Sequence, residues 1–337
     1  MAHPLAVTPF SLGLPLTRAE GLWFEDCGLI IRAEKTIYRV SSAVLAMQSV
    51  VFRDMLSMPT PMDAEMIDGC PFVSLPDSAE DITNFLKAIF CYGFFDPAPA
   101  PTTFGILCSV LRMSRKYEVD ELKKRALAHL SQAHPTTLED WENVDELPSW
   151  KTESSDSDGN IDQNVVTVSV ARQVGATWIL PTAFYRMCQD SVEESFVMND
   201  ALDASDTVNL IKGLRFLETT GVSDVLAFLN IVLLYKSCCT GPSTFERAWG
   251  LQKIAAHLRT LAALQLCADG TQVMPFELWS ADDWKEMGSY TCKHCISEMK
   301  KVHSRRCQKL WEELPEIFGL PSWEELRKMK AEALELE

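Results

Sequence analysis

The sequence has no apolar run long enough to cross a bilayer. Its longest apolar run, residues 225–235, has 11 residues and includes Asn230, whereas a membrane-spanning helix needs about 20 predominantly apolar residues. Residues 1–20 contain three prolines and lack the basic start and uninterrupted apolar core of a signal peptide. We therefore expect no membrane partner and a location in the cytoplasm or the nucleus.

Basic residues are scarce in the chain. Lys and Arg total 31 against 47 Asp and Glu, which gives a net charge of −16. A surface of this sign repels phosphate backbones, so nucleic-acid binding is disfavoured. One basic run stands out, and we interpret it as a solvated helix face paired with nearby acids, while docking of an acidic partner or RNA stays open. The run comprises Lys300, Lys301, Arg305, Arg306 and Lys309, and the acids are Glu298, Glu312 and Glu313.

Common enzyme motifs are also absent. The chain has no H-E-x-x-H, G-x-S-x-G, G-x-x-x-x-G-K-[ST] or G-x-G-x-x-G, which are signatures of zinc proteases, serine hydrolases, P-loop proteins and dinucleotide-binding proteins. A non-catalytic protein without a cofactor is therefore expected. The alternative is an enzyme or small-ligand binder with a pocket in the second half of the chain. The candidate lining residues of that pocket are Cys188, Cys238, Cys239, His257 and Cys267.

Eleven cysteines are present, and without a secretory signal we expect them to be thiols. Cys292 and Cys295 form a C-x2-C pair, and His303 and Cys307 follow, so the ligand types of a zinc site are present. On one straight helix these four residues span about 22 Å, which is too long for one tetrahedral ion. Packed or exposed thiols are therefore favoured and no metal is expected, with structural zinc as the alternative.

Residues 29–58 carry the clearest structural pattern. Apolar residues 29–31, a turn at 33–35 and the β-branched and aromatic residues of 36–40 predict a two-stranded hairpin. Ser41 and Ser42 suit a helix N-terminus, and helical spacing of apolar residues resumes after Ser49. The stretch therefore predicts two strands that lead into two short helices.

Further elements are predicted up to residue 134. Residues 72–75 offer a short strand, and a helix begins after residues 76–78 with an apolar face that should form the buried spine of this part. The proline-rich residues 96–103 cannot be helical. A helical hairpin is expected from residue 104 to residue 130, with its turn at 116–118.

This order of elements resembles the start of a BTB/POZ domain. The family's helical signature L-x-x-x-S-x-x-F-x-x-M is matched by Leu45, Ser49, Phe52 and Met55, and Asp26 stands at its acidic position. Ser41 occupies the place where the family usually has His. Residues 75–95 and 111–130 are similar to the family's central helix and closing helical hairpin. In detail the sequence most resembles those of BTB proteins of mushroom-forming fungi.

The resemblance implies that the chain forms a homodimer through its N-terminal arm, its opening strand and the helix at 42–47. It also implies a charged pocket in which Asp26 pairs with Arg39 or Arg53. Many family members bind other proteins, including a cullin of a ubiquitin ligase, through the central helices, and others act in transcription. The implied interaction residues are Trp23, Phe24, Asp26, Arg39, Phe52, Met55, Leu56, Phe94 and Phe95.

The expected fold class is α+β, with a BTB/POZ domain followed by a mostly α-helical domain. We divide the chain into an arm at 1–20, the BTB/POZ domain at 21–134, an acidic Ser-rich linker at 135–164 and a helical domain at 165–337. Gly and Pro separate the helices expected in the last part. Their expected ranges are 165–174, 181–188, 201–217, 222–235, 245–266, 281–287, 292–314 and 323–334.

Overall fold

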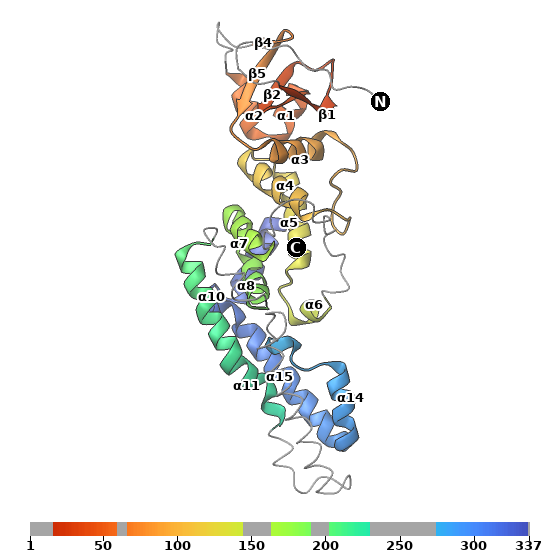
Figure 1. Ribbon diagram of the computed structural model, residues 1–337, viewed down its shortest axis with the longest axis vertical. Coiled ribbons are helices and arrows are strands. Elements are labelled where there is room, and N and C mark those ends of the chain that lie inside the picture. Colours follow the sequence, from red (N-terminus) through yellow and green to blue (C-terminus); the bar gives the residue numbers. More distant parts are fainter. Residues whose placement is uncertain (1–15, 59–65, 144–162, 190–201, 230–273, 336–337) are drawn as a thin grey trace.

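The computed structural model describes residues 16–58, 66–143, 163–189, 202–229 and 274–335. They form an elongated α+β molecule with a small sheet at one end and helices extending to the other (Figure 1). Within these ranges no helix has both the length and the apolar character that a membrane crossing requires.

The sheet has five strands in the order β1-β3-β2-β5-β4. β2 and β3 form the expected antiparallel hairpin, with Ile31 opposite Tyr38 and Glu34 at the turn with φ of 51°. β1 pairs with β3 and β5 pairs with β2, both in parallel. The strands are β1 (Thr17–Trp23), β2 (Leu29–Ala33), β3 (Thr36–Val40), β4 (Met66–Ile67) and β5 (Cys70–Leu75).

The strand β1 corrects the expected boundary of the N-terminal arm. Residues 17–20, assigned to the arm from the sequence, are the first residues of this strand. The strand is irregular, because its register against β3 shifts between Arg18 and Trp23 and Gly21 has φ of 74°. A positive φ suits glycine, which has no Cβ to clash with the backbone.

The helix pair after the hairpin is confirmed. Ser41 caps α1 (Ser42–Gln48) and Ser49 caps α2 (Val50–Ser57), each by accepting a hydrogen bond from a backbone N–H in the first turn. The Ser49 hydroxyl also donates to the carbonyl oxygen of Tyr117. This hydrogen bond connects the junction of α1 and α2 to the helices that follow the sheet.

The expected spine helix and helical hairpin are present too. They are α3 (Ala79–Phe90), α4 (Phe104–Lys116) and α5 (Asp120–Ala133), with Tyr117 and Glu118 at the turn. Tyr117 organises the core of this part, because its ring stacks on Phe52 at 4.7 Å and on Phe85 at 5.6 Å between centroids. Its hydroxyl donates to a carboxylate oxygen of Asp77 at 2.5 Å.

The rest of the described chain is helical. A five-residue helix, α6 (Leu138–Glu142), lies inside the expected linker 135–164 and buries Leu138 and Trp141, so the linker prediction was wrong for this stretch. The expected helix at 245–266 and residues 230–235 of another lie outside the described residues. The other helices are α7 (Gln163–Val174), α8 (Leu180–Gln189), α10 (Ala204–Phe216), α11 (Val222–Val225), α14 (Ala281–Tyr290), α15 (Lys293–Ile317) and α16 (Trp323–Leu334).

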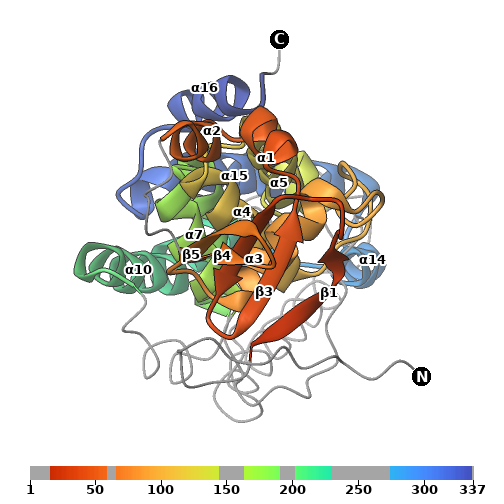
Figure 2. The ribbon, with the colours of Figure 1, turned by 90° about the horizontal axis from the view of Figure 1, so that it is seen from above.

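One hydrophobic core runs from the sheet into the helical half. Trp178, only 2% exposed, donates from Nε1 to the Ser131 hydroxyl of α5 at 2.9 Å. Viewed along the long axis of the molecule, the helical half lies behind the sheet (Figure 2), and α16, although it comes last in the chain, packs against α5. The two parts that the sequence suggested as separate domains are therefore packed against each other.

The close packing of the helical half is visible at α10 and α15. Gly213 faces the ring of Phe318, and a Cβ at this position would lie 2.2 Å from a ring carbon. Glycine is therefore required for this approach. Trp311 and Trp323 stack with centroids 5.3 Å apart, and Trp323 Nε1 donates to the Trp311 carbonyl oxygen at 2.6 Å.

A buried histidine at this packed region should make stability depend on pH. His134 Nδ1 lies 3.2 Å from the Thr182 hydroxyl, and burial, followed by the charge of Arg186, holds the pKa of His134 well below its usual value. A depressed pKa in the folded state means that stability is complete above about pH 6.5 and falls as the pH drops below it.

We expect a loss of about 1 kcal/mol from His134 between pH 7 and pH 5.5. Urea unfolding at the two pH values measures it, with His134→Gln as the comparison, because Gln keeps a polar group but does not titrate. The variant should be less stable overall but should show a smaller decrease on acidification. Equal decreases in both proteins would contradict the role of His134.

Candidate functional site

Apolar side chains are exposed where α1 meets α2. Met47 is 74% exposed and Val50 is 36% exposed, whereas Leu45 and Phe52 of the same helices point into the core. The break at Ser49 produces this arrangement, because the extended backbone there ends one helix and starts the next. We call Met47 and Val50 the α1–α2 patch. Such side chains are available for burial in a contact with another chain.

The predicted interaction residues of α2 lie deeper than expected. Phe52 is 1% exposed and stacks on Tyr117, so its assignment to an interaction surface was wrong. Met55 and Leu56 are half-buried and pack against the core. The helical spacing of these residues was predicted correctly. However, the positions of α2 that carry the resemblance lie on its inner face and not on its outer face.

The loop after α3 also differs from the prediction. Phe95 is 3% exposed and packs on the His129 ring at 5.1 Å, so it belongs to the core. Phe94 is half-buried, and the Lys87 ammonium lies 5.6 Å from its ring centroid. The fully exposed aromatic residue here is Tyr92, which the sequence analysis missed. Its neighbour Gly93, with φ of 75°, was the available signal for an exposed turn.

Charged and aromatic side chains gather at β1. The Arg18 guanidinium lies 4.2 Å from the Trp23 ring centroid, and Trp23 Nε1 donates to Glu25 Oε1 at 3.2 Å. Arg39 Nη1 donates to Glu25 Oε2 at 2.9 Å, while Arg39 Nε donates to the Cys27 carbonyl oxygen at 2.7 Å. Side chains of β1, of β3 and of the turn after β1 thus form one polar cluster on the sheet.

This cluster corrects the expected charged pocket. Arg39 pairs with Glu25, and Arg53 pairs with its neighbour Asp54 at 3.4 Å, so neither is the partner of Asp26. Asp26 is exposed at the turn after β1. Glu25 and Asp26 are adjacent in the sequence, and only the turn geometry decides which carboxylate points at Arg39, so the sequence alone did not identify Glu25 as the partner of Arg39.

The strand β1 lies at an edge of the sheet. Within the described residues it has a strand neighbour on one side only, namely β3. An edge strand presents backbone donors and acceptors that another chain can pair with. Trp23, the last residue of this strand, and Phe24 after it are half-buried, and the Phe24 ring lies 6.0 Å from the Phe90 ring.

The four candidate zinc ligands do not converge. Cys292 caps the N-terminus of α15, and Cys295, His303 and Cys307 lie along the same continuous helix. Cys307 and His303 approach each other, at 3.7 Å between Sγ and Nε2, and burial raises the pKa of Cys307 to about 12. No group of three or more metal-ligating side chains gathers anywhere in the described part of the chain. The geometry therefore contradicts one ion held by all four residues.

The basic run of α15 follows its predicted pairing in part. Lys301 pairs with Glu298 at 2.7 Å and Lys309 with Glu313 at 3.5 Å. Arg306 instead pairs with Asp224 of α11, at 3.7 Å. Among the residues suggested for a ligand pocket, Cys188 is buried in α8, and the other four lie outside the described residues.

Comparisons of the chain with models of known protein families, with curated proteins and with solved structures found no match.

Proposed function

We propose that this protein is a non-catalytic interaction module of the BTB/POZ type, which self-associates through its first half. The observation that carries the proposal is the α1–α2 patch, in which Met47 and Val50 are exposed on a rigid pair of capped helices. Burying such side chains against a second chain removes apolar surface from water, which stabilises the pair.

Support for the family assignment comes from the order of elements in the first half. A hairpin leads into two short helices, a further strand and a spine helix follow, and a helical hairpin ends the unit. The residues of the signature, Leu45, Ser49 and Phe52, hold this arrangement from inside the core. A dimer with twofold symmetry places the same patch on both chains, so one exposed surface is sufficient for self-association.

A second surface suits a different protein partner, such as a cullin. The observation that favours it is the loop after α3, where Tyr92 is fully exposed beside the half-buried Phe94. Tyrosine is enriched in the central contacts of protein interfaces. In this proposal the α1–α2 patch serves self-association, and Tyr92 serves recruitment.

Sedimentation velocity over a range of micromolar concentrations tests self-association. The wild-type chain should be a dimer, and the double variant Met47→Glu, Val50→Glu should dissociate at least tenfold more readily, because two carboxylates would face their copies across the interface. The matched control is Val208→Glu, Ile211→Glu on α10, whose side chains are 47% and 48% exposed. The control should remain a dimer. A monomeric wild-type protein, or equal effects of the two double variants, would overturn the proposal.

A further inference from the structure

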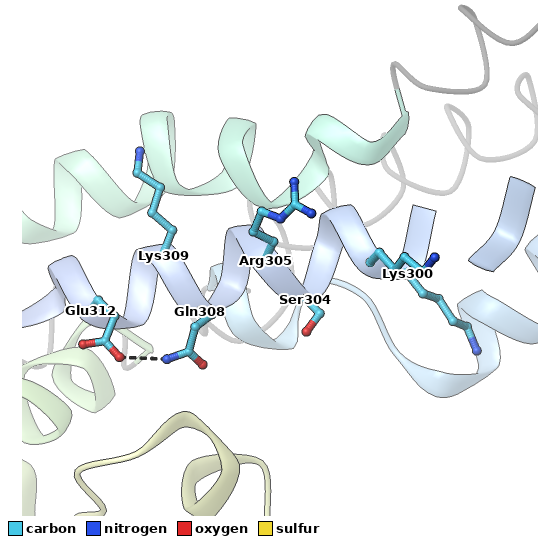
Figure 3. A pocket seen from close by; sticks show the side chains of 7 residues that line it. Lys300, Ser304, Arg305, Gln308, Lys309 and Glu312 are labelled. Atoms are coloured by element: carbon cyan, nitrogen blue, oxygen red, sulfur yellow. Dashed lines mark hydrogen bonds between the residues drawn. The ribbon is translucent and has the colours of Figure 1, made fainter. Parts of the chain in front are cut away.

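A basic groove lies along α15, a helix in the half of the molecule far from the sheet (Figure 1), and Figure 3 shows the groove from close by. Arg305 and Lys309 point to one side of the helix, while Ser304, Gln308 and Glu312 point to the other (Figure 3). The groove has a volume of ≈810 Å³ and is open to solvent along its length. It is lined by Lys300, Lys301, Ser304, Arg305, Gln308, Lys309 and Glu312.

The charge of this groove is opposite to that of the whole protein. Four cationic side chains line it, against the carboxylate of Glu312, while the chain carries a net charge of −16. Local concentration of one sign of charge in a groove attracts a ligand of the other sign.

Three of the four cations of the groove, Lys301, Arg305 and Lys309, remain available to a ligand, whereas the Lys300 ammonium lies 5.6 Å from the Trp284 ring centroid. Within the described residues Arg305 has no ion-pair partner within 4.0 Å. The ion pairs of Lys301 and Lys309 are at the surface and join residues three or four positions apart on α15. Such exposed pairs contribute little and exchange partners easily. Glu312 is already engaged, since it accepts a hydrogen bond from Gln308 at 2.8 Å and pairs with Arg327 at 3.6 Å.

The spacing of the cations matches an extended peptide. Lys301, Arg305 and Lys309 are four residues apart on α15, so successive cations lie about 6 Å apart along the helix axis. In an extended chain, side chains that point to the same side come from alternate residues, which are about 6.6 Å apart. Carboxylates at alternate positions of such a peptide therefore meet the three cations in register.

We propose that the α15 groove binds an acidic segment of a partner protein in extended conformation, with carboxylates at alternate residues facing Lys301, Arg305 and Lys309. RNA fits the observations less well, because the carboxylate of Glu312 also lines the groove and the protein as a whole repels phosphate. The groove is separate from the first half, so this inference is independent of the proposed self-association.

Fluorescence anisotropy with the full-length protein tests the proposal. The probe is a labelled peptide in which Asp alternates with Ser, and the comparison ligand is a single-stranded oligouridylate of the same length. The peptide should bind more tightly than the oligouridylate, and added salt should weaken its binding, because the contact is electrostatic. The triple variant Lys301→Gln, Arg305→Gln, Lys309→Gln should bind the peptide about tenfold more weakly.

The matched control removes the same charge elsewhere on the protein. It is the triple variant Lys35→Gln, Arg115→Gln, Lys328→Gln, whose side chains are all exposed and outside the groove. Its affinity for the peptide should stay within twofold of wild type. Equal loss of affinity in the two triple variants would assign the binding to overall charge and overturn the proposal. Tighter binding of the oligouridylate, or no binding of the peptide, would overturn it as well.

Discussion

Replacing Trp178 with Ala should lower the free energy of unfolding by about 3–5 kcal/mol, which is typical for removal of a buried aromatic side chain. Trp178 is 2% exposed, and its indole N–H is hydrogen-bonded to Ser131 of α5. The side chain therefore joins the first half of the molecule to the helical half, and its loss leaves both a cavity and an unpaired hydroxyl group in the interior.

Chemical denaturation monitored by circular dichroism measures this effect. Trp178→Phe is the matched variant, because Phe fills most of the volume but cannot donate to Ser131. Its cost should be smaller than that of Trp178→Ala, with about 1–3 kcal/mol from the lost hydrogen bond. A decrease below 1 kcal/mol for Trp178→Ala would show that the contact between the two halves contributes little to stability.

Phe52→Ala should cost about 3–5 kcal/mol as well, because Phe52 is a core residue and not a contact residue. Its side chain is 1% exposed, and its ring stacks on Tyr117, which in turn contacts Phe85. The residue therefore holds α2 against the helical hairpin of α4 and α5. Thermal unfolding and urea unfolding of the variant measure the loss.

The neighbouring residue supplies the control for Phe52. Arg53 is exposed, and its ion pair with Asp54 joins adjacent residues at the surface, so Arg53→Ala should change stability by less than about 0.5 kcal/mol. A Phe52→Ala protein that keeps the stability of wild type but loses self-association would contradict its placement in the core and would restore the surface role that the sequence suggested.

Local signals explain what the sequence predicted well. The hairpin of β2 and β3 follows from alternation and turn residues, and the helices after it follow from Ser41 and Ser49, which cap them. The helical hairpin was also predicted, from residue 104 to residue 130, and α5 continues to Ala133, shortly before Pro135, which cannot continue a helix. These features depend on residues a few positions apart.

Features that depend on distant residues were missed. The strand β1 contains Glu20 and Gly21, which disfavour a strand, and it forms because it pairs with β3 further along the chain. The helix α6 has only five residues, although Thr137 before it and the i, i+3 pair Leu138 and Trp141 were usable signals.

The same distinction between local signals and contacts of distant residues applies to the candidate site. The helical spacing of apolar residues predicted α2 correctly but not which of its residues face solvent, since burial depends on what packs against the helix. Phe52 and Phe95 are inside, whereas Met47 and Tyr92 are outside. Met47 belongs to the helix at 42–47 that the resemblance implied for the dimer contact, but Tyr92 was not predicted. The partner of Arg39 was missed for the related reason that a turn, and not the sequence order, points Glu25 at it.

The most direct test of the proposed role of the first half is hydrogen–deuterium exchange of the wild-type protein. The exchange is compared at protein concentrations above and below the dissociation constant of the dimer. We expect slower exchange at high concentration in residues 42–58 and 17–23, with no change in α10, where exposed Val208 and Ile211 serve as an internal control. Concentration-dependent protection confined to α10 or to other parts of the helical half would contradict self-association through the α1–α2 patch.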